Sequence, residues 1–342
     1  MTQIPRHDFI TPKGRRIALT RLGLGTAPLG NIYAPLPQDQ ALATLAAAWD
    51  AGIRFFDTAP LYGLGLAETR LNHLLRGKPR ADYALASKVG RILRHRLPGT
   101  LPPRTHYFDT PSREVVFDYG YDGVMRSVEH SLERLGADRF DILYVHDLGA
   151  DTHGSREAAN ARLAEFLGGG MRALDELRSA GVVDAIGAGC NEWEVCEALA
   201  RAADVDVFLL AGRYTLLEQT ALSSFLPLCV ERGIGVVVGG PYNSGILAGG
   251  TTYNYRPAPA AVIERVGRLR AAAQQHGIPI EAAALAFPLA HPAVVAVVAG
   301  AVTPDEVHRN RTFFATPVPA AFWSGLKALG LLADGAPVPA GA

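Results

Sequence analysis

Three apolar, strand-like runs of the sequence each end on an ionisable side chain. Asp57 lies in FFDTAPLYG, Lys88 ends YALASK and His146 ends DILYVH, while Tyr62 follows Asp57 by five residues. A Tyr phenol has an ordinary pKa of about 10 and is a poor base at neutral pH, but a nearby ammonium favours the phenolate and lowers that pKa. Lys88 would supply the ammonium, and Asp57 would hold it by an ion pair. A neutral His146 would hydrogen-bond the reacting oxygen.

Such a set can move one proton on or off an alcohol oxygen, but it lacks a hydride acceptor, so it implies a nicotinamide cofactor. Taken singly, an Asp at a strand end is usually a helix cap, and a Tyr or His is usually a satisfied core group. Four such groups on one face of a barrel favour catalysis, because barrel active sites gather there. We predict no metal: a hydrolase using His146 and Asp147 would need more ligands, and no HxH or other His cluster lies at a strand end.

The elements that would position these residues are eight short apolar runs. They are near-continuous rather than alternating, as expected for parallel strands buried on both faces. The predicted strands cover residues 22–30, 53–58, 83–88, 141–146, 182–188, 205–211, 235–240 and 293–298. Helical periodicity lies between them, at 41–52, 121–136, 162–181 and 261–277. This alternation predicts an α/β protein, a single (β/α)8 TIM barrel over residues 1–342, with a doubly wound Rossmann-type sheet as the alternative.

Three segments depart from the simple alternation of strand and helix. Residues 90–120 form a long connection between the third strand and its helix, and in a barrel this loop would hang over the C-terminal face, where it is expected to serve the active site. The tail 335–342 is predicted to be frayed. Residues 282–304 carry no Asp, Glu, Lys or Arg, but proline interrupts them, so we expect helix, turn and strand rather than a membrane span.

The composition limits the classes of molecule that this protein is expected to bind. Lys plus Arg equals Asp plus Glu, at 33 each, which gives no pull toward nucleic acid or an anionic membrane. We expect a small neutral molecule or another protein as the partner, and a monomer or small homo-oligomer. Three cysteines fit no disulfide framework and the N-terminus shows no signal peptide, so the expected compartment is the cytoplasm.

The motifs FFDTAPLYG, ASKVG and DILYVHD, with the order Asp, Tyr, Lys, His, resemble those of the aldo-keto reductase superfamily. The resemblance covers almost the whole chain, from about residue 22 to residue 310. It implies that Tyr62 is the proton donor or acceptor, that Lys88 and Asp57 tune it, and that His146 orients the substrate oxygen.

The resemblance also implies cofactor-binding residues. In GAGCNEW the family's Asn is kept as Asn191, which would grip the nicotinamide carboxamide. The family's stacking aromatic has no clear equivalent, and Tyr214 or Tyr242 would have to replace it. The stretch PYNSGILAGG resembles the diphosphate-binding loop, with backbone contacts from Ser244, Gly245 and Leu247.

The segment AGAVTPDEVHRN bears on the type of cofactor. Family members that prefer NADP carry a Lys and an Arg here, which hold the 2′-phosphate. This chain has Gly300 at the Lys position and Glu306 at the Arg position, while Asn310 is kept. A carboxylate would repel a 2′-phosphate and could accept hydrogen bonds from a free 2′-hydroxyl, which favours NAD. NADP, bound through Arg309 or Arg311, is the alternative, and Glu306 could instead simply complement the helix dipole.

Within the family, GTAPLGNIY, LAGRYTLLEQ and GGPYNSGILA are most similar to the branch of bacterial L-fucose and D-threo-aldose 1-dehydrogenases. That branch implies oxidation of the anomeric carbon of a sugar to the aldonolactone, with Tyr62 as general base. The sugar pocket would be lined by Asn31, Tyr33, the 90–120 loop and Trp193, although Trp193 could equally pack at a helix end. The alternatives are a pyridoxal 4-dehydrogenase, an NADPH-dependent aldehyde reductase and a nicotinamide-binding regulatory subunit.

Overall fold

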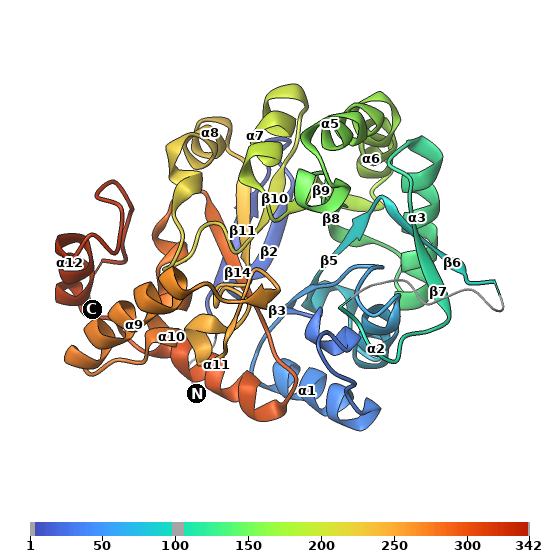
Figure 1. The fold of residues 1–342 in the computed structure, drawn as a ribbon. Helices are drawn as coiled ribbons and strands as arrows, with labels where there is room; N and C mark the ends of the chain where they lie inside the picture. Colours follow the sequence, from blue (N-terminus) through green and yellow to red (C-terminus); the bar gives the residue numbers. More distant parts are fainter. Residues whose placement is uncertain (1–3, 98–105, 341–342) are drawn as a thin grey trace.

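The computed structural model, which describes residues 4–97 and 106–340, contains a closed barrel of eight parallel strands (Figure 1). Each strand pairs with the next one of the barrel along the chain, and the last pairs with the first. The strands are β3 (Leu22–Gly25), β4 (Phe55–Asp57), β5 (Ala84–Val89), β8 (Phe140–His146), β9 (Val183–Cys190), β10 (Val207–Ala211), β11 (Gly235–Gly239) and β14 (Val294–Gly300). The predicted (β/α)8 TIM barrel is confirmed, and the Rossmann-type alternative is wrong.

Helices cover the outside of the barrel (Figure 1). They are α1 (Gln38–Asp50), α2 (Leu66–Leu75), α3 (Tyr121–Leu135), α4 (Ala150–His153), α5 (Arg156–Glu165), α6 (Met171–Ser179), α7 (Trp193–Ala202), α8 (Phe225–Arg232), α9 (Ala260–Gln275), α10 (Ile280–Ala286), α11 (Pro304–Ala315) and α12 (Ala320–Ala328). The glycine-rich middle of the predicted 162–181 helix is a π-helical turn, Phe166–Gly170, between α5 and α6.

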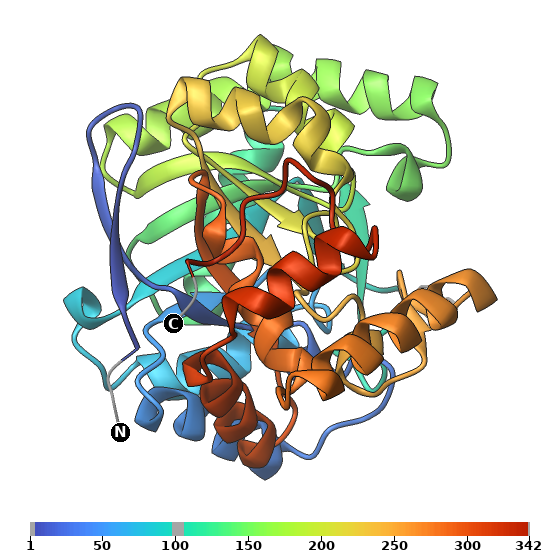
Figure 2. The ribbon, with the colours of Figure 1, turned by 90° about the vertical axis from the view of Figure 1, so that its left-hand side faces the viewer.

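An N-terminal hairpin, which the sequence analysis did not assign, closes the amino end of the barrel. Its antiparallel strands are β1 (Arg6–Ile10) and β2 (Arg16–Thr20), drawn in dark blue in Figure 2. Phe9, Ile17 and Leu19 are buried in one cluster with inward-facing side chains of the barrel strands. The hairpin therefore seals that end with apolar contacts.

Two further hairpins contribute to the opposite end. The 90–120 segment, expected to be a loop, contains β6 (Arg91–His95) paired with β7 (Arg113–Phe117); residues 98–105 lie outside the described part. After β11, the short strands β12 (Thr252–Tyr253) and β13 (Arg256–Pro257) form the other hairpin. Residues from both line a cavity together with the carboxyl ends of the barrel strands.

The tail, predicted to be frayed, touches the core at two residues in the described part. Ala336 is 1% exposed, and Val338 packs against the same core cluster; residues 341–342 lie outside the described part. The charge-poor segment 282–304 forms α10, a turn and β14, as predicted. None of the helices in the described residues is both long and apolar enough to cross a membrane.

Candidate active site

An ion pair joins the carboxyl ends of β4 and β5. Lys88 Nζ donates hydrogen bonds to Asp57 Oδ1 at 3.0 Å, to Asp57 Oδ2 at 2.8 Å and to the main-chain oxygen of Thr58 at 2.9 Å. Both charged side chains are buried, with Lys88 2% and Asp57 3% exposed. Since a charge in the interior needs a partner, each residue holds the other in place, and the expected ion pair is present.

Tyr62 and His146 lie beside this pair. Tyr62 is in the turn after β4 and His146 ends β8; their ring centroids are 5.9 Å apart and their planes are nearly perpendicular, at 89°. Lys88 Nζ lies 4.7 Å from the centroid of the Tyr62 ring. The structure thus brings together the four residues that the sequence separates by up to about ninety positions.

The protonation of Tyr62 differs from the sequence-based expectation. Lys88 was expected to lower the pKa of the phenol, but its three ammonium hydrogens are directed at Asp57 and Thr58. Burial raises the pKa of Tyr62 well above its ordinary value, and the charges of Asp57 and Asp147 raise it further, whereas Arg91 opposes them. The phenol is therefore protonated at neutral pH.

His146 is neutral, as expected, and has neighbours that the sequence analysis missed. Burial lowers the pKa of His146 well below its ordinary value, and the charges of Arg91 and Lys88 lower it further. His146 Nε2 lies 3.5 Å from Asp147 Oδ2, to which Arg91 Nη2 donates at 2.6 Å. The Tyr119 hydroxyl donates to the main-chain oxygens of His146 and Asp147, both at 3.0 Å. These contacts hold the end of β8 in one position.

Two adjoining cavities open at these residues. The first, which we call the catalytic cavity, has a volume of about 620 Å³ and includes Lys88 and His146 in its wall. The second, which we call the glycine-lined cavity, has a volume of about 440 Å³. Tyr62, Asn191 and Tyr255 line both. The cavities therefore adjoin, and Tyr62 lies at their junction.

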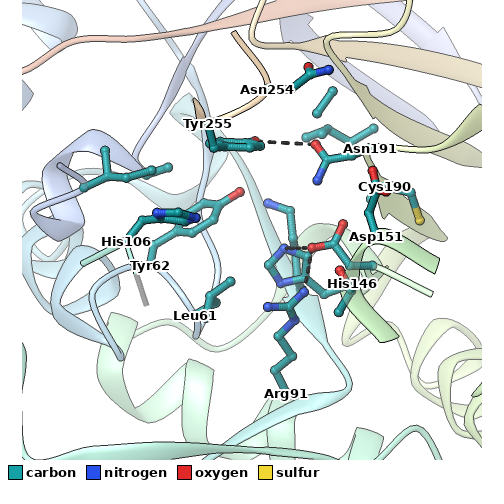
Figure 3. Close-up of a pocket in the computed structure, with 18 of the residues that line it drawn as sticks. Leu61, Tyr62, Arg91, His106, His146, Asp151, Cys190, Asn191, Asn254 and Tyr255 are labelled. Atoms are coloured by element: carbon teal, nitrogen blue, oxygen red, sulfur yellow. Dashed lines mark hydrogen bonds and ion pairs between the residues drawn. The ribbon is translucent and has the colours of Figure 1, made fainter. Parts of the chain in front are cut away.

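Aromatic rings form one side of the catalytic cavity. In Figure 3 the rings of Tyr62, His106 and Tyr255 lie together, and Asn191 and His146 face them. His106 stacks on Tyr255 with a centroid distance of 6.2 Å and an angle of 18°. The Tyr255 hydroxyl donates to Asn191 Oδ1 at 3.4 Å. Tyr255 and His106 come from the two hairpin regions and were not predicted, because no local pattern shows that these segments meet.

Part of the wall of the glycine-lined cavity is backbone that carries no side chain. Ser244, Gly245 and Gly300 line it, as does Gly240. Gly240 and Gly245 have φ values of +57° and +97°, and a Cβ at either would meet no atom within 4 Å. Backbone without side chains lets a diphosphate approach closely, so these residues fit a dinucleotide. Leu247 does not line this cavity and is fully buried.

Of the two predicted cofactor residues on α11, Glu306 lines the glycine-lined cavity and Asn310 does not. Glu306 lines the glycine-lined cavity, and its Oε2 accepts a hydrogen bond from Val302 N at 2.7 Å while its own N–H donates to Thr303 Oγ1. This reciprocal arrangement resembles a capping box, so Glu306 also holds the start of the helix. Asn310 does not line the cavity; its Oδ1 accepts from the Tyr242 hydroxyl at 2.9 Å.

The predicted substrate residues are mostly elsewhere, which corrects the sequence-based assignment. Asn31 is buried and bonded within its own surroundings, and it lines neither cavity. Tyr33 lines the glycine-lined cavity rather than the catalytic one. Trp193 lines neither and packs against the core. Of the two candidate stacking rings, Tyr242 lines the glycine-lined cavity, whereas Tyr214 is buried against Phe287.

The described residues contain no group of three or more His, Cys, Asp or Glu side chains that could hold a metal ion. What they can do is move a proton at Tyr62, beside a neutral His146, next to a cavity that fits a dinucleotide.

Comparison with known proteins identifies the family of the chain. The model of the Aldo/keto reductase family matches residues 21–330. A pyridoxal 4-dehydrogenase from Microbacterium luteolum is 43% identical, over 92% of this chain and 95% of that protein. A D-threo-aldose 1-dehydrogenase from a Pseudomonas species is 39% identical, over 91% of this chain and 94% of that protein. Among solved structures, an aldo-keto reductase from Bacillus halodurans in its holo form has the same fold, with a TM-score of 0.72 and 24% identity over 96% of both chains.

Proposed function

Because the chain belongs to the aldo/keto reductase family and is an NAD(P)-dependent oxidoreductase acting on CH–OH groups, we propose that it is an aldose 1-dehydrogenase. It would oxidise the anomeric carbon of a cyclic aldose to the aldonolactone. The observation that carries this proposal is the position of Tyr62, with its Lys88 and His146 neighbours, at the junction of the two cavities. A ring hemiacetal there would present both its hydroxyl and its C–H bond.

The proposed mechanism uses the chain's own groups for the proton. A nicotinamide cofactor held in the glycine-lined cavity would supply the hydride acceptor for the anomeric carbon. Tyr62, in its deprotonated form, takes the hydroxyl proton of the substrate, so that the C–O bond becomes the carbonyl of the lactone. The neutral imidazole of His146 hydrogen-bonds the same oxygen. Lys88 is held by Asp57, and its Nζ lies 4.7 Å from the centroid of the Tyr62 ring, on whose face the ammonium packs.

Glu306 and Gly300 support NAD as the preferred cofactor. The Glu306 carboxylate lines the glycine-lined cavity, where it would repel a 2′-phosphate and accept a hydrogen bond from a free 2′-hydroxyl. A Cβ at Gly300 would lie 2.7 Å from Pro28 Cγ, so the backbone leaves little room for a phosphate-binding lysine there. The same two residues argue against an NADPH-dependent aldehyde reductase.

A second candidate substrate is pyridoxal, whose cyclic hemiacetal would undergo the same oxidation to a lactone. Two observations favour it: the 43% identity to a pyridoxal 4-dehydrogenase, and the rings of Tyr62, Tyr107 and Tyr255 in the wall of the catalytic cavity, since aromatic faces stack well on a flat ring.

The absorbance of reduced nicotinamide separates these candidates. The purified protein would be incubated with NAD, and separately with NADP, together with L-fucose, D-arabinose, L-galactose or pyridoxal. We expect turnover of an aldose with NAD. Turnover of pyridoxal alone would replace the aldose as substrate, and reduction of simple aldehydes with NADPH alone would contradict the proposed direction and cofactor.

The three cysteines, which are free and buried, support the cytoplasm as the compartment.

A further inference from the structure

A buried arginine organises the loop that joins β3 to α1. Arg70, on α2, is 4% exposed. Its guanidinium donates four hydrogen bonds of 2.6–2.9 Å to acceptors in residues 29–38, which are the main-chain oxygens of Leu29 and Leu36 and the side-chain oxygens of Asn31 and Gln38. All four acceptors are neutral, and burying a cation is costly without such bonds. The loop is thus wrapped around one cation.

Asn31 extends this arrangement to the segment 106–108. Its Nδ2 donates to the Phe108 oxygen at 3.0 Å, and its main-chain oxygen accepts from Phe108 N at 3.0 Å. Tyr33 N donates to the His106 oxygen at 2.9 Å, and Ile32 pairs with Tyr107 in an antiparallel bridge. The segment is therefore attached to the loop by its backbone, whatever its side chains contact.

The same loop also touches the backbone of the catalytic tyrosine. A Cβ at Gly30 would lie 2.6 Å from Tyr62 C and from Gly63 N, so glycine is needed for this close approach. The loop thus sets the distance between the Tyr62 phenol and the segment 106–108. The Tyr107 ring lies in the wall of the catalytic cavity, with its centroid 6.3 Å from that of Tyr62.

We propose that Tyr107 is a specificity-determining residue that selects ring-shaped substrates, and that Asn31 and Arg70 are positioning residues that hold it opposite Tyr62. This deepens the proposed function and rests on it for the substrate class. A ring bound at Tyr62 reaches the Tyr107 side chain and gains contact with its face. A three-carbon substrate does not span the cavity of about 620 Å³ and gains little from this wall.

The test compares reduction of benzaldehyde, a ring-shaped aldehyde, with reduction of methylglyoxal, a short open-chain one, both with NADH. It therefore does not depend on which hemiacetal the enzyme oxidises. Tyr107→Ala, Asn31→Ala and Arg70→Met should each lower the ratio of the two kcat/KM values by about tenfold or more. The loss should come from the KM for benzaldehyde. Arg76→Met, at the exposed end of the same helix, is the matched control and should leave the ratio unchanged.

Hydrogen exchange and cofactor binding separate positioning from general damage. In Asn31→Ala and Arg70→Met, the amide of Phe108 should exchange faster, while NADH should quench the protein fluorescence with an unchanged Kd. Faster exchange with an unchanged substrate ratio overturns the proposal, and so does an equal loss of activity on both aldehydes. If Arg70→Met does not fold, the ratios of kcat/KM measured for Asn31→Ala and Tyr107→Ala test the proposal instead. A lack of hemiacetal oxidation by the unaltered enzyme would contradict the proposed function alone.

Discussion

The two ends of the barrel differ in what covers them. At the amino end, Phe9, Ile17 and Leu19 of the β1–β2 hairpin are at most 5% exposed and pack with apolar residues such as Phe55. At the carboxyl end, charged side chains that are at most 14% exposed form the ion pairs Lys88–Asp57 and Arg91–Asp147.

This difference separates stability from chemistry. Burying an apolar side chain stabilises the fold by about 1.5–3 kcal/mol, whereas a buried ion pair contributes little net stability, because desolvation offsets the attraction. Buried ion pairs also lie at the amino ends of strands, Arg80–Asp141 and Arg178–Asp206. What distinguishes the carboxyl end is that its Lys88–Asp57 pair lies beside Tyr62 and His146 at a cavity. Changes at one end should alter catalysis and changes at the other should alter stability, and four measurements test how far this holds.

The largest effect is expected for Tyr62→Phe at the catalytic end. Removing the hydroxyl removes the proton acceptor, so kcat should fall by about 10²- to 10⁴-fold. The ring remains, so the Kd for NADH and the Tm should stay close to those of the unaltered protein. Steady-state kinetics, nucleotide titration and thermal unfolding would show this. Activity within a few-fold of the original would mean that Tyr62 is not the acid–base group.

Phe9→Ala at the amino end should lower the stability of the protein and leave kcat unchanged, the opposite of Tyr62→Phe. Phe9 is 5% exposed in the apolar cluster that the hairpin forms with the barrel strands, and its truncation should reduce the free energy of unfolding by about 3–5 kcal/mol. Denaturant unfolding measures the change, and kcat well below the Tm should be unaltered. Ile10→Ala, on the same strand but 55% exposed, is the control. A large loss of kcat in Phe9→Ala would show that the two ends are coupled.

The pH dependence should report the charges at the catalytic end. Burial raises the pKa of Tyr62 above its ordinary value, and oxidation needs the deprotonated phenol, so its rate should rise about tenfold per pH unit from neutral to alkaline pH. Reduction needs the protonated phenol and should not rise. The lowered pKa of His146 means that no further loss should occur as pH falls through about 6.5. Rate profiles in both directions, with Tyr62→Phe as reference, check this; a maximum for oxidation below neutral pH would contradict it.

The smallest effect is expected where the glycine-lined cavity meets α11. Glu306→Gln keeps the hydrogen bond that begins the helix but removes the charge, so the preference for NAD over NADP should fall by about two- to fivefold. Asp305→Asn, the neighbouring exposed carboxylate, should leave the preference unchanged. Ratios of kcat/KM for the two cofactors measure both. An unchanged preference in Glu306→Gln would mean that its carboxylate serves only the helix.

Much of the barrel could be predicted because buried parallel strands have a local signature. The run DILYVH forms β8, which is buried along its whole length, and the eight predicted runs all became barrel strands. The N-terminal hairpin was missed although RIALT in β2 alternates exposed and buried residues. This alternation is the signal that could have found it.

The site could be predicted only in part. Tyr62 and Lys88 follow from their places after predicted strands, but Asn31 and Trp193 were assigned to the wrong surroundings. Asn31 turns toward Arg70 and Phe108, which are about forty and eighty positions away in the chain, so no local pattern can show its direction. Arg91 was missed for the same reason, because its importance depends on its contact with Asp147.

The sequence by itself determined the order of strands and the four polar residues at their ends, because hydrophobic period and strand length are local properties of the chain. Only the tertiary structure decided the protonation of Tyr62, the surroundings of Asn31 and the shape of the two cavities. These depend on burial and on distances of a few ångströms between residues far apart in sequence, and such distances exist only once the barrel has closed.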